Sequence, residues 1–112
     1  MNRPERAGTV VARFRVGADH PALPGHFPGR PVVPGVLLLD AVLQALRDTG
    51  AGRPTHLLRA KFAAAVMPGT EVEIALAPGA QASGRFAFTC RANGAVVLLG
   101  EVACATPHPP AP

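Results

Sequence analysis

The sequence has no tryptophan and no tyrosine, so its five phenylalanines are its entire aromatic content. A domain with so few rings must build its core from aliphatic side chains. It also offers no aromatic platform on which nucleobases could stack. The formal charge is +4, but the basic residues are scattered along the chain. This pattern argues against a nucleic-acid-binding protein, and a mildly basic surface would equally suit an acidic protein partner.

Long apolar runs and cysteine clusters are also absent. No apolar run approaches the roughly 20 residues of a membrane span, and the first eight residues lack the apolar core of a secretory signal. Two cysteines, Cys90 and Cys104, are too few for a disulfide framework or a zinc cluster. The usual phosphate-binding and dinucleotide-binding glycine motifs are missing as well. We therefore expect a cytoplasmic, reduced protein without a metal or cofactor.

What remains is an apolar chain of the size of one domain. Of its 112 residues, 48% are hydrophobic and 16% are charged, which argues against disorder. The length suffices for one hydrophobic core and is too short for two. We expect a single domain over residues 1–105, followed by a proline-rich tail over 106–112 without fixed structure.

Hydrophobic periodicity predicts one helix and about five strands. Alternating apolar residues predict a strand over 8–16. A helix is expected over residues 35–49, with apolar residues around nearly its whole circumference. A second strand is expected over His56–Val66, with Leu58 and Phe62 facing inward. The remaining strands are expected near 72–76, 86–90 and 96–104, the last two joined by a hairpin turn at Asn93-Gly94.

These elements predict an α+β fold with a buried helix against a mostly antiparallel sheet. A helix that is apolar all round needs cover on every side, and one small sheet covers a single side. We therefore expect a second copy of the chain to cover more of it.

The stretch from residue 25 to residue 44 carries the candidate chemistry. His26 lies in a loop rich in proline and glycine, and Pro34-Gly35 precedes a helix whose first amides lack intrahelical partners. Asp40 lies in apolar surroundings, where an ionised carboxylate is costly without a partner. Each feature alone has an ordinary structural explanation. Together they supply an imidazole, a carboxyl group and a helix N-terminus that favours negative charge.

This stretch closely resembles the 3-hydroxyacyl-[acyl-carrier-protein] dehydratases of the hotdog fold. The matching residues are Gly25, His26, Phe27, Pro28, Pro31, Pro34, Gly35, Val36, Leu37 and the acid Asp40. Lys61-Phe62 and Pro68-Gly69-Thr70 match further on, so that the resemblance covers residues 10–105. It implies a hotdog fold, in which one long central helix is wrapped by an antiparallel sheet of about five or six strands.

The acid of the helix departs from part of that family. Chain-elongation dehydratases that share the loop carry glutamate there, whereas the sister dehydratase/isomerases carry aspartate, followed four residues later by glutamine. Asp40 and Gln44 follow the second pattern. The acyl chain length and any isomerase activity therefore stay open.

The resemblance implies that the substrate is a 3-hydroxyacyl thioester on acyl carrier protein, which loses water to give the trans-2-enoyl thioester. His26 would take the C2 proton, Asp40 would protonate the departing hydroxyl, and the amide of Gly35 would stabilise the thioester oxygen. The histidine of one protomer faces the acid of the other in this family, which implies a homodimer or a larger oligomer of dimers.

The other candidate residues have supporting roles. Gln44 either orients the Asp40 carboxyl or is a buried amide with its own partners. Candidate walls of the acyl tunnel are Leu38, Leu39, Val42 and Phe62, and candidate contacts to the carrier protein are Arg30, Arg59 and Lys61. Two alternatives stay open: a hotdog thioesterase, and a non-catalytic subunit that binds acyl carrier protein.

Overall fold

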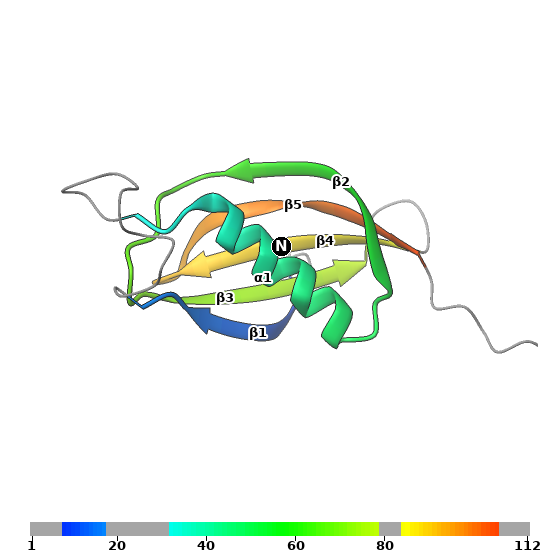
Figure 1. Ribbon diagram of the computed structural model, residues 1–112, viewed down its shortest axis with the longest axis horizontal. Coiled ribbons are helices and arrows are strands. Elements are labelled where there is room, and N and C mark those ends of the chain that lie inside the picture. Colours follow the sequence, from blue (N-terminus) through cyan, green and yellow to red (C-terminus); the bar gives the residue numbers. More distant parts are fainter. Residues whose placement is uncertain (1–7, 18–31, 79–83, 106–112) are drawn as a thin grey trace, which may run out of the picture.

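The computed structural model describes residues 8–17, 32–78 and 84–105. Within these residues the chain forms one helix and five strands (Figure 1). In chain order they are β1 (Thr9–Arg15), α1 (Gly35–Asp48), β2 (Arg53–Phe62), β3 (Glu71–Pro78), β4 (Arg85–Ala92) and β5 (Ala95–Ala105). The predicted tail, residues 106–112, lies outside the described residues.

The five strands form one antiparallel sheet in the order β1-β3-β4-β5-β2. The predicted hairpin is confirmed, because Ala92 pairs with Ala95 across a two-residue turn. Asn93 has φ 54° and Gly94 has φ 80°, the two positive values that a tight hairpin turn of this kind needs. Helix α1 crosses one face of the sheet, with β1 and β2 at the two edges (Figure 1).

The core lies between this helix and the sheet. Val42 and Leu46 of α1 are completely buried, and Leu38 and Ala45 are nearly so. The inner face of the sheet meets them with residues that alternate along the central strands: Val72, Ile74, Leu76, Phe88, Cys90, Leu98 and Val102. The predicted aliphatic core is thus observed, and both cysteines are buried and free within it.

Strand β2 differs from the prediction at its end and in its register. It ends at Phe62 rather than Val66, because the amides of Ala63 and Ala64 both turn to the carbonyl of Val97. A bulge between Leu57 and Arg59 breaks the alternation, so that Leu57 rather than Leu58 lies opposite Val102. The prediction that Leu58 faces inward is therefore wrong, and its side chain is 43% exposed.

Helix α1 is buried on one side only. Val36 is 67% exposed, and Asp40 and Gln44 lie on the same open face at four-residue spacing. The expectation of a helix buried all round is therefore wrong for the single chain, because the sheet covers a single face. This helix, the only one among the described residues, is too short to span a membrane.

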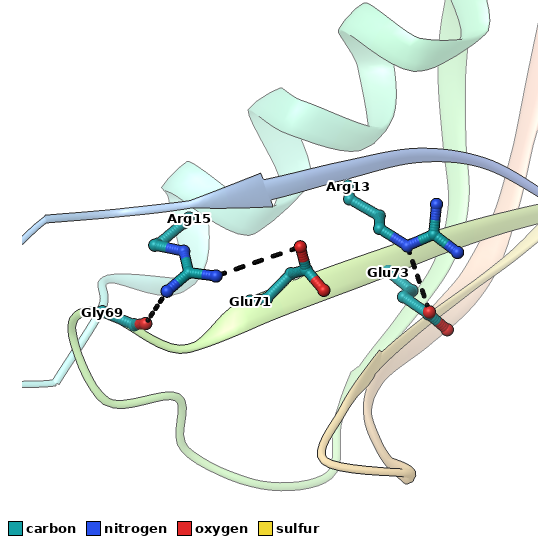
Figure 2. Close-up of polar contacts among 5 residues, drawn as sticks. All are labelled: Arg13, Arg15, Gly69, Glu71 and Glu73. Atoms are coloured by element: carbon teal, nitrogen blue, oxygen red, sulfur yellow. Dashed lines mark hydrogen bonds and ion pairs between the residues drawn. The ribbon is translucent and has the colours of Figure 1, made fainter.

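The β1 edge of the sheet carries its charges in pairs. Arg13 Nε lies 3.2 Å from Glu73 Oε2, and Arg15 Nη2 lies 3.9 Å from Glu71 Oε2 (Figure 2). Arg15 also donates a hydrogen bond of 3.0 Å to the carbonyl of Gly69. Such exposed pairs contribute little to stability. They do neutralise the outer face of this edge.

Candidate active site

A cavity of about 520 Å³ opens at the first turn of α1. It is bounded by Val32, Val33, Pro34, Gly35, Leu38, Phe62, Ala63, Ala64, Ala65 and Val66. The amide of Val33 donates a 2.8 Å hydrogen bond to the carbonyl of Val66, which ties the segment before the helix to the segment after β2. Every residue that lines the cavity is apolar or glycine, so the backbone supplies its polar groups. The cavity joins two segments, 32–38 and 62–66, that lie far apart in the sequence.

The start of the helix faces this cavity without a cap. Pro34 has φ −59° and ψ 138°, makes no capping hydrogen bond through its side chain, and is followed by no acidic residue in the first turn. The first bond of the turn runs from the amide of Leu37 to the carbonyl of Pro34, at 3.0 Å. Among the described residues, none accepts a hydrogen bond from the amide of Gly35. A helix-start amide without an intrahelical partner can bind an anion or a polarised oxygen.

The ring of Phe62 lies against Gly35. A Cβ atom at position 35 would lie 2.7 Å from Cε1 and 2.9 Å from Cζ of that ring, which is closer than real contacts allow. The ring is 50% exposed, so it forms one wall of the cavity and still reaches solvent. Three predicted residues, Gly35, Leu38 and Phe62, are therefore brought together at one site.

Asp40 and Gln44 lie elsewhere on the helix. Asp40 is exposed and does not border the cavity. Gln44 Nε2 donates a 2.9 Å hydrogen bond to Asp48 Oδ1, so in the single chain its amide is turned toward that carboxylate. The apolar surroundings expected for Asp40 are not supplied by this chain itself.

The other candidate residues are dispersed. Val42 is completely buried in the core, Leu39 packs against the core, and neither borders the cavity. Arg59 and Lys61 are exposed on β2. His26 and Arg30 lie outside the described residues.

Several wall residues were not predicted from the sequence. Val33 and Val66 are buried at the cavity, and Ala63, Ala64 and Ala65 also line it. The run of three alanines directly after Phe62 is a signal that could have been used, because small side chains beside a large ring leave space.

Among the described residues we find neither a reactive thiol nor a metal-binding cluster. Burial raises the pKa of the Cys90 thiol to about 12, and it also raises the pKa of Cys104. Both thiols are thus protonated near neutral pH and are poor nucleophiles. No group of three or more metal-binding side chains occurs among the described residues.

Comparison with known proteins identifies the family. The model of the ApeI-like family, described as ApeI dehydratase, matches residues 2–101. The chain is 33% identical over 101 residues to 3-hydroxyacyl-[acyl-carrier-protein] dehydratase FabZ of Haemophilus influenzae, covering 80% of this chain and 64% of that protein. It is 31% identical over 110 residues to the enzyme of the same name from Yersinia pestis, covering 87% and 62%. The chain thus spans a little under two thirds of the length of these relatives.

Solved structures agree on the fold. A chain of the dehydratase heterocomplex ApeI:P from Xenorhabdus doucetiae superposes with a TM-score of 0.70 at 18% identity, covering 83% of this chain and 84% of that one. An uncharacterized protein from Erwinia carotovora gives 0.67 at 22% identity, covering 81% and 77%. The predicted hotdog fold and the predicted family resemblance are both confirmed. The chain belongs to the ApeI-like dehydratase family and has the hotdog fold.

Proposed function

We propose that this protein removes water from a 3-hydroxyacyl thioester carried on acyl carrier protein, in the synthesis of a fatty acid or a related lipid or polyketide. The observation that carries the proposal is the uncapped start of α1 at Gly35, which opens into an apolar cavity beside Phe62. An acyl thioester has both parts that such a site would bind: a polar carbonyl and an apolar chain.

In the proposed reaction His26 takes a proton from C2, because the unperturbed pKa of histidine lies near neutrality. The electrons of that C–H bond form the double bond between C2 and C3. The C3–O bond breaks as Asp40 gives its proton to the hydroxyl, which leaves as water. The proton on His26 then passes to the Asp40 carboxylate, directly or through solvent, so that both groups regain their starting states.

The thioester oxygen gains negative charge when C2 loses its proton. A hydrogen bond from the amide of Gly35 would stabilise that charge more strongly than it stabilises the neutral carbonyl, which is the condition for lowering the barrier. The absence of a side chain at position 35 lets the thioester approach the backbone closely. The acyl chain would follow Leu38 and Phe62 into the cavity, and Arg59 and Lys61 would contact the acidic carrier protein.

The working unit is proposed to be a pair of hotdog chains. Asp40 and Val36 lie on the face of α1 that the sheet leaves open, and β2 also carries exposed apolar residues. A second chain over this face would supply the apolar surroundings that Asp40 lacks in the single chain. It would also bring a second loop with a histidine toward the acid. The sequence predicts a second copy for this role, and the solved relative from Xenorhabdus doucetiae is a heterocomplex.

The test is to offer the purified protein a 3-hydroxyacyl thioester, or the enoyl thioester for the reverse reaction, on acyl carrier protein. Enoyl absorbance and free thiol are followed in parallel. A change of absorbance without thiol release supports dehydration, whereas thiol release indicates a thioesterase. No change in either, with carrier-linked substrate, indicates a binding subunit. His56→Ala is the matched control for His26→Ala, because His56 is exposed on β2, where its Nδ1 lies 3.1 Å from Thr55 Oγ1.

A further inference from the structure

The cavity at the start of α1 has an exposed mouth and a buried inner end. Phe62 is half exposed, and the three alanines at 63–65 that follow it are exposed as well. At the other end Val33 and Val66 are buried, and Leu38 is only 2% exposed. Among the described residues, a ligand that enters past the phenyl ring therefore meets these three side chains last.

The inner end of the cavity is fixed in place. The amide of Val33 donates a 2.8 Å hydrogen bond to the carbonyl of Val66, so these two walls cannot separate without losing that bond. Leu38 closes the cavity on the side of the helix. The next residues on its face of α1, Val42 and Leu46, are completely buried and do not border the cavity. Leu38 thus separates the cavity from a close-packed core that has no room for a further chain.

A second cavity, of about 240 Å³, lies at the other end of α1 and does not continue the first. It is bounded by Val11, Thr49, Gly50, Ala51, Leu76, Ala77 and Phe86. The two cavities share no residue. In the part of the chain that the structure describes, an apolar group bound at the start of the helix therefore has no passage toward the helix end.

The position of Leu38 sets a length for a bound acyl chain. Leu38 follows Gly35 by three residues, which is about 4.5 Å along the helix axis. Its side chain leans toward the start of the helix, as helical side chains do. An extended carbon chain advances roughly 1.2 Å per bond, a third of the rise of an extended residue with its three backbone bonds. A thioester carbonyl held at Gly35 therefore places about the fifth or sixth carbon against Leu38.

We propose that Leu38 limits the length of the acyl chain, so that the preferred substrates are short 3-hydroxyacyl thioesters of up to about six carbons. The inference rests on the proposed function and names the substrate class within it. Carbons up to the limit gain apolar cover in the cavity. Carbons beyond it have to turn back toward the mouth and solvent, where they gain none.

Chain length is the variable that tests this proposal. The rate constant kcat/KM is measured on carrier-linked 3-hydroxyacyl thioesters that differ by one carbon, from about four to about twelve carbons. In the wild-type chain it should rise about fourfold per added carbon, as for a methylene group removed from water, and stop rising at about six carbons. Leu38→Ala removes three carbon atoms from the inner end and should move this break to about nine carbons.

Two further variants control for folding and stability. Leu38→Val removes one carbon atom and should move the break by about one carbon; it carries the test if the alanine variant does not fold by circular dichroism. Leu46→Ala is the matched control, because it makes the same substitution at a completely buried leucine of the same helix that does not border the cavity. It should lose stability and keep the break at about six carbons.

A binding measurement separates this inference from the proposed function. Saturated acyl-pantetheine thioesters cannot lose water, and their Kd, measured by calorimetry, should show the same break and the same displacement in Leu38→Ala. A break in Kd without dehydration at any length would overturn the proposed function and keep the length limit. Dehydration without a break, or with a break that Leu38→Ala leaves in place, would overturn the length limit and keep the proposed function. Neither dehydration nor binding at any length would overturn both.

Discussion

The contact between Gly35 and Phe62 gives the sharpest prediction about the site. In Gly35→Ala the new Cβ would lie 2.7 and 2.9 Å from two atoms of the ring, about 1 Å inside normal contact. The ring is half exposed, so it can move outward rather than compress the core. We therefore expect a loss of unfolding free energy of about 1 kcal/mol, at the lower end of the range for overpacking. We expect turnover to fall about 100-fold, because the amide and the cavity wall both move by a distance that matters for catalysis.

Denaturant unfolding and the enoyl absorbance assay measure the two effects. Gly50→Ala is the matched control: its φ of 79° strains an alanine by about 1 kcal/mol, but no atom lies within 4 Å of the added methyl group. It should lose comparable stability and keep its activity. In the Phe62→Ala background, Gly35→Ala should cost little further stability, because the clash has been removed. An equal loss of stability with and without the ring would refute this reasoning.

Four further predictions follow from the fold and the site. His26→Ala should lower turnover by about 10²–10⁴-fold with an unchanged circular dichroism spectrum, as for loss of a general base; equal activity would remove His26 from the mechanism. Asp40→Asn should lower turnover comparably without loss of stability, since the side chain is exposed in the single chain. Phe88→Ala should lower the unfolding free energy by about 3–5 kcal/mol in denaturant titrations, because the ring is 1% exposed. Unfolding free energy should fall from about pH 9 toward pH 12, by at most about 4 kcal/mol, because the unfolded Cys90 thiol ionises near 9.0 and the folded one near 12. Cys90→Ala should reduce this pH dependence. The chain has no tyrosine, whose ionisation would add to the pH dependence in this range.

The elements of the fold could be predicted where local pattern and tertiary environment agree. In strand β3, Val72 and Ile74 are buried and alternate with the more exposed Glu71 and Glu73. Such an alternation fixes which face of the strand points to the core. The hairpin at Asn93-Gly94 is equally determined, because both positions need positive φ. These predictions depend on neighbouring residues only.

The errors arose where a residue's surroundings come from distant segments or from another chain. Leu58 fits an inward position by alternation, but a bulge moves it out, and a bulge leaves no local signature in this sequence. Val36 is apolar and yet 67% exposed in the single chain, because apolar composition does not reveal which molecule provides the cover.

The candidate site also combines a feature that the local sequence predicts with one that depends on a distant segment. The glycine at position 35 could be chosen from its place after a proline and before a helix. The close approach of the Phe62 ring to this glycine is a contact between residues twenty-seven positions apart. Periodicity cannot supply such a contact.

The central claim is that the protein adds or removes water across C2 and C3 of an acyl thioester. The most direct measurement is to incubate the protein with a carrier-linked trans-2-enoyl thioester in isotopically labelled water and to analyse the products by mass spectrometry. If the protein is a dehydratase, the labelled oxygen is found on C3 of an intact thioester, and His26→Ala gives no such product. Label in a released carboxylic acid, with the thioester bond broken, would contradict it.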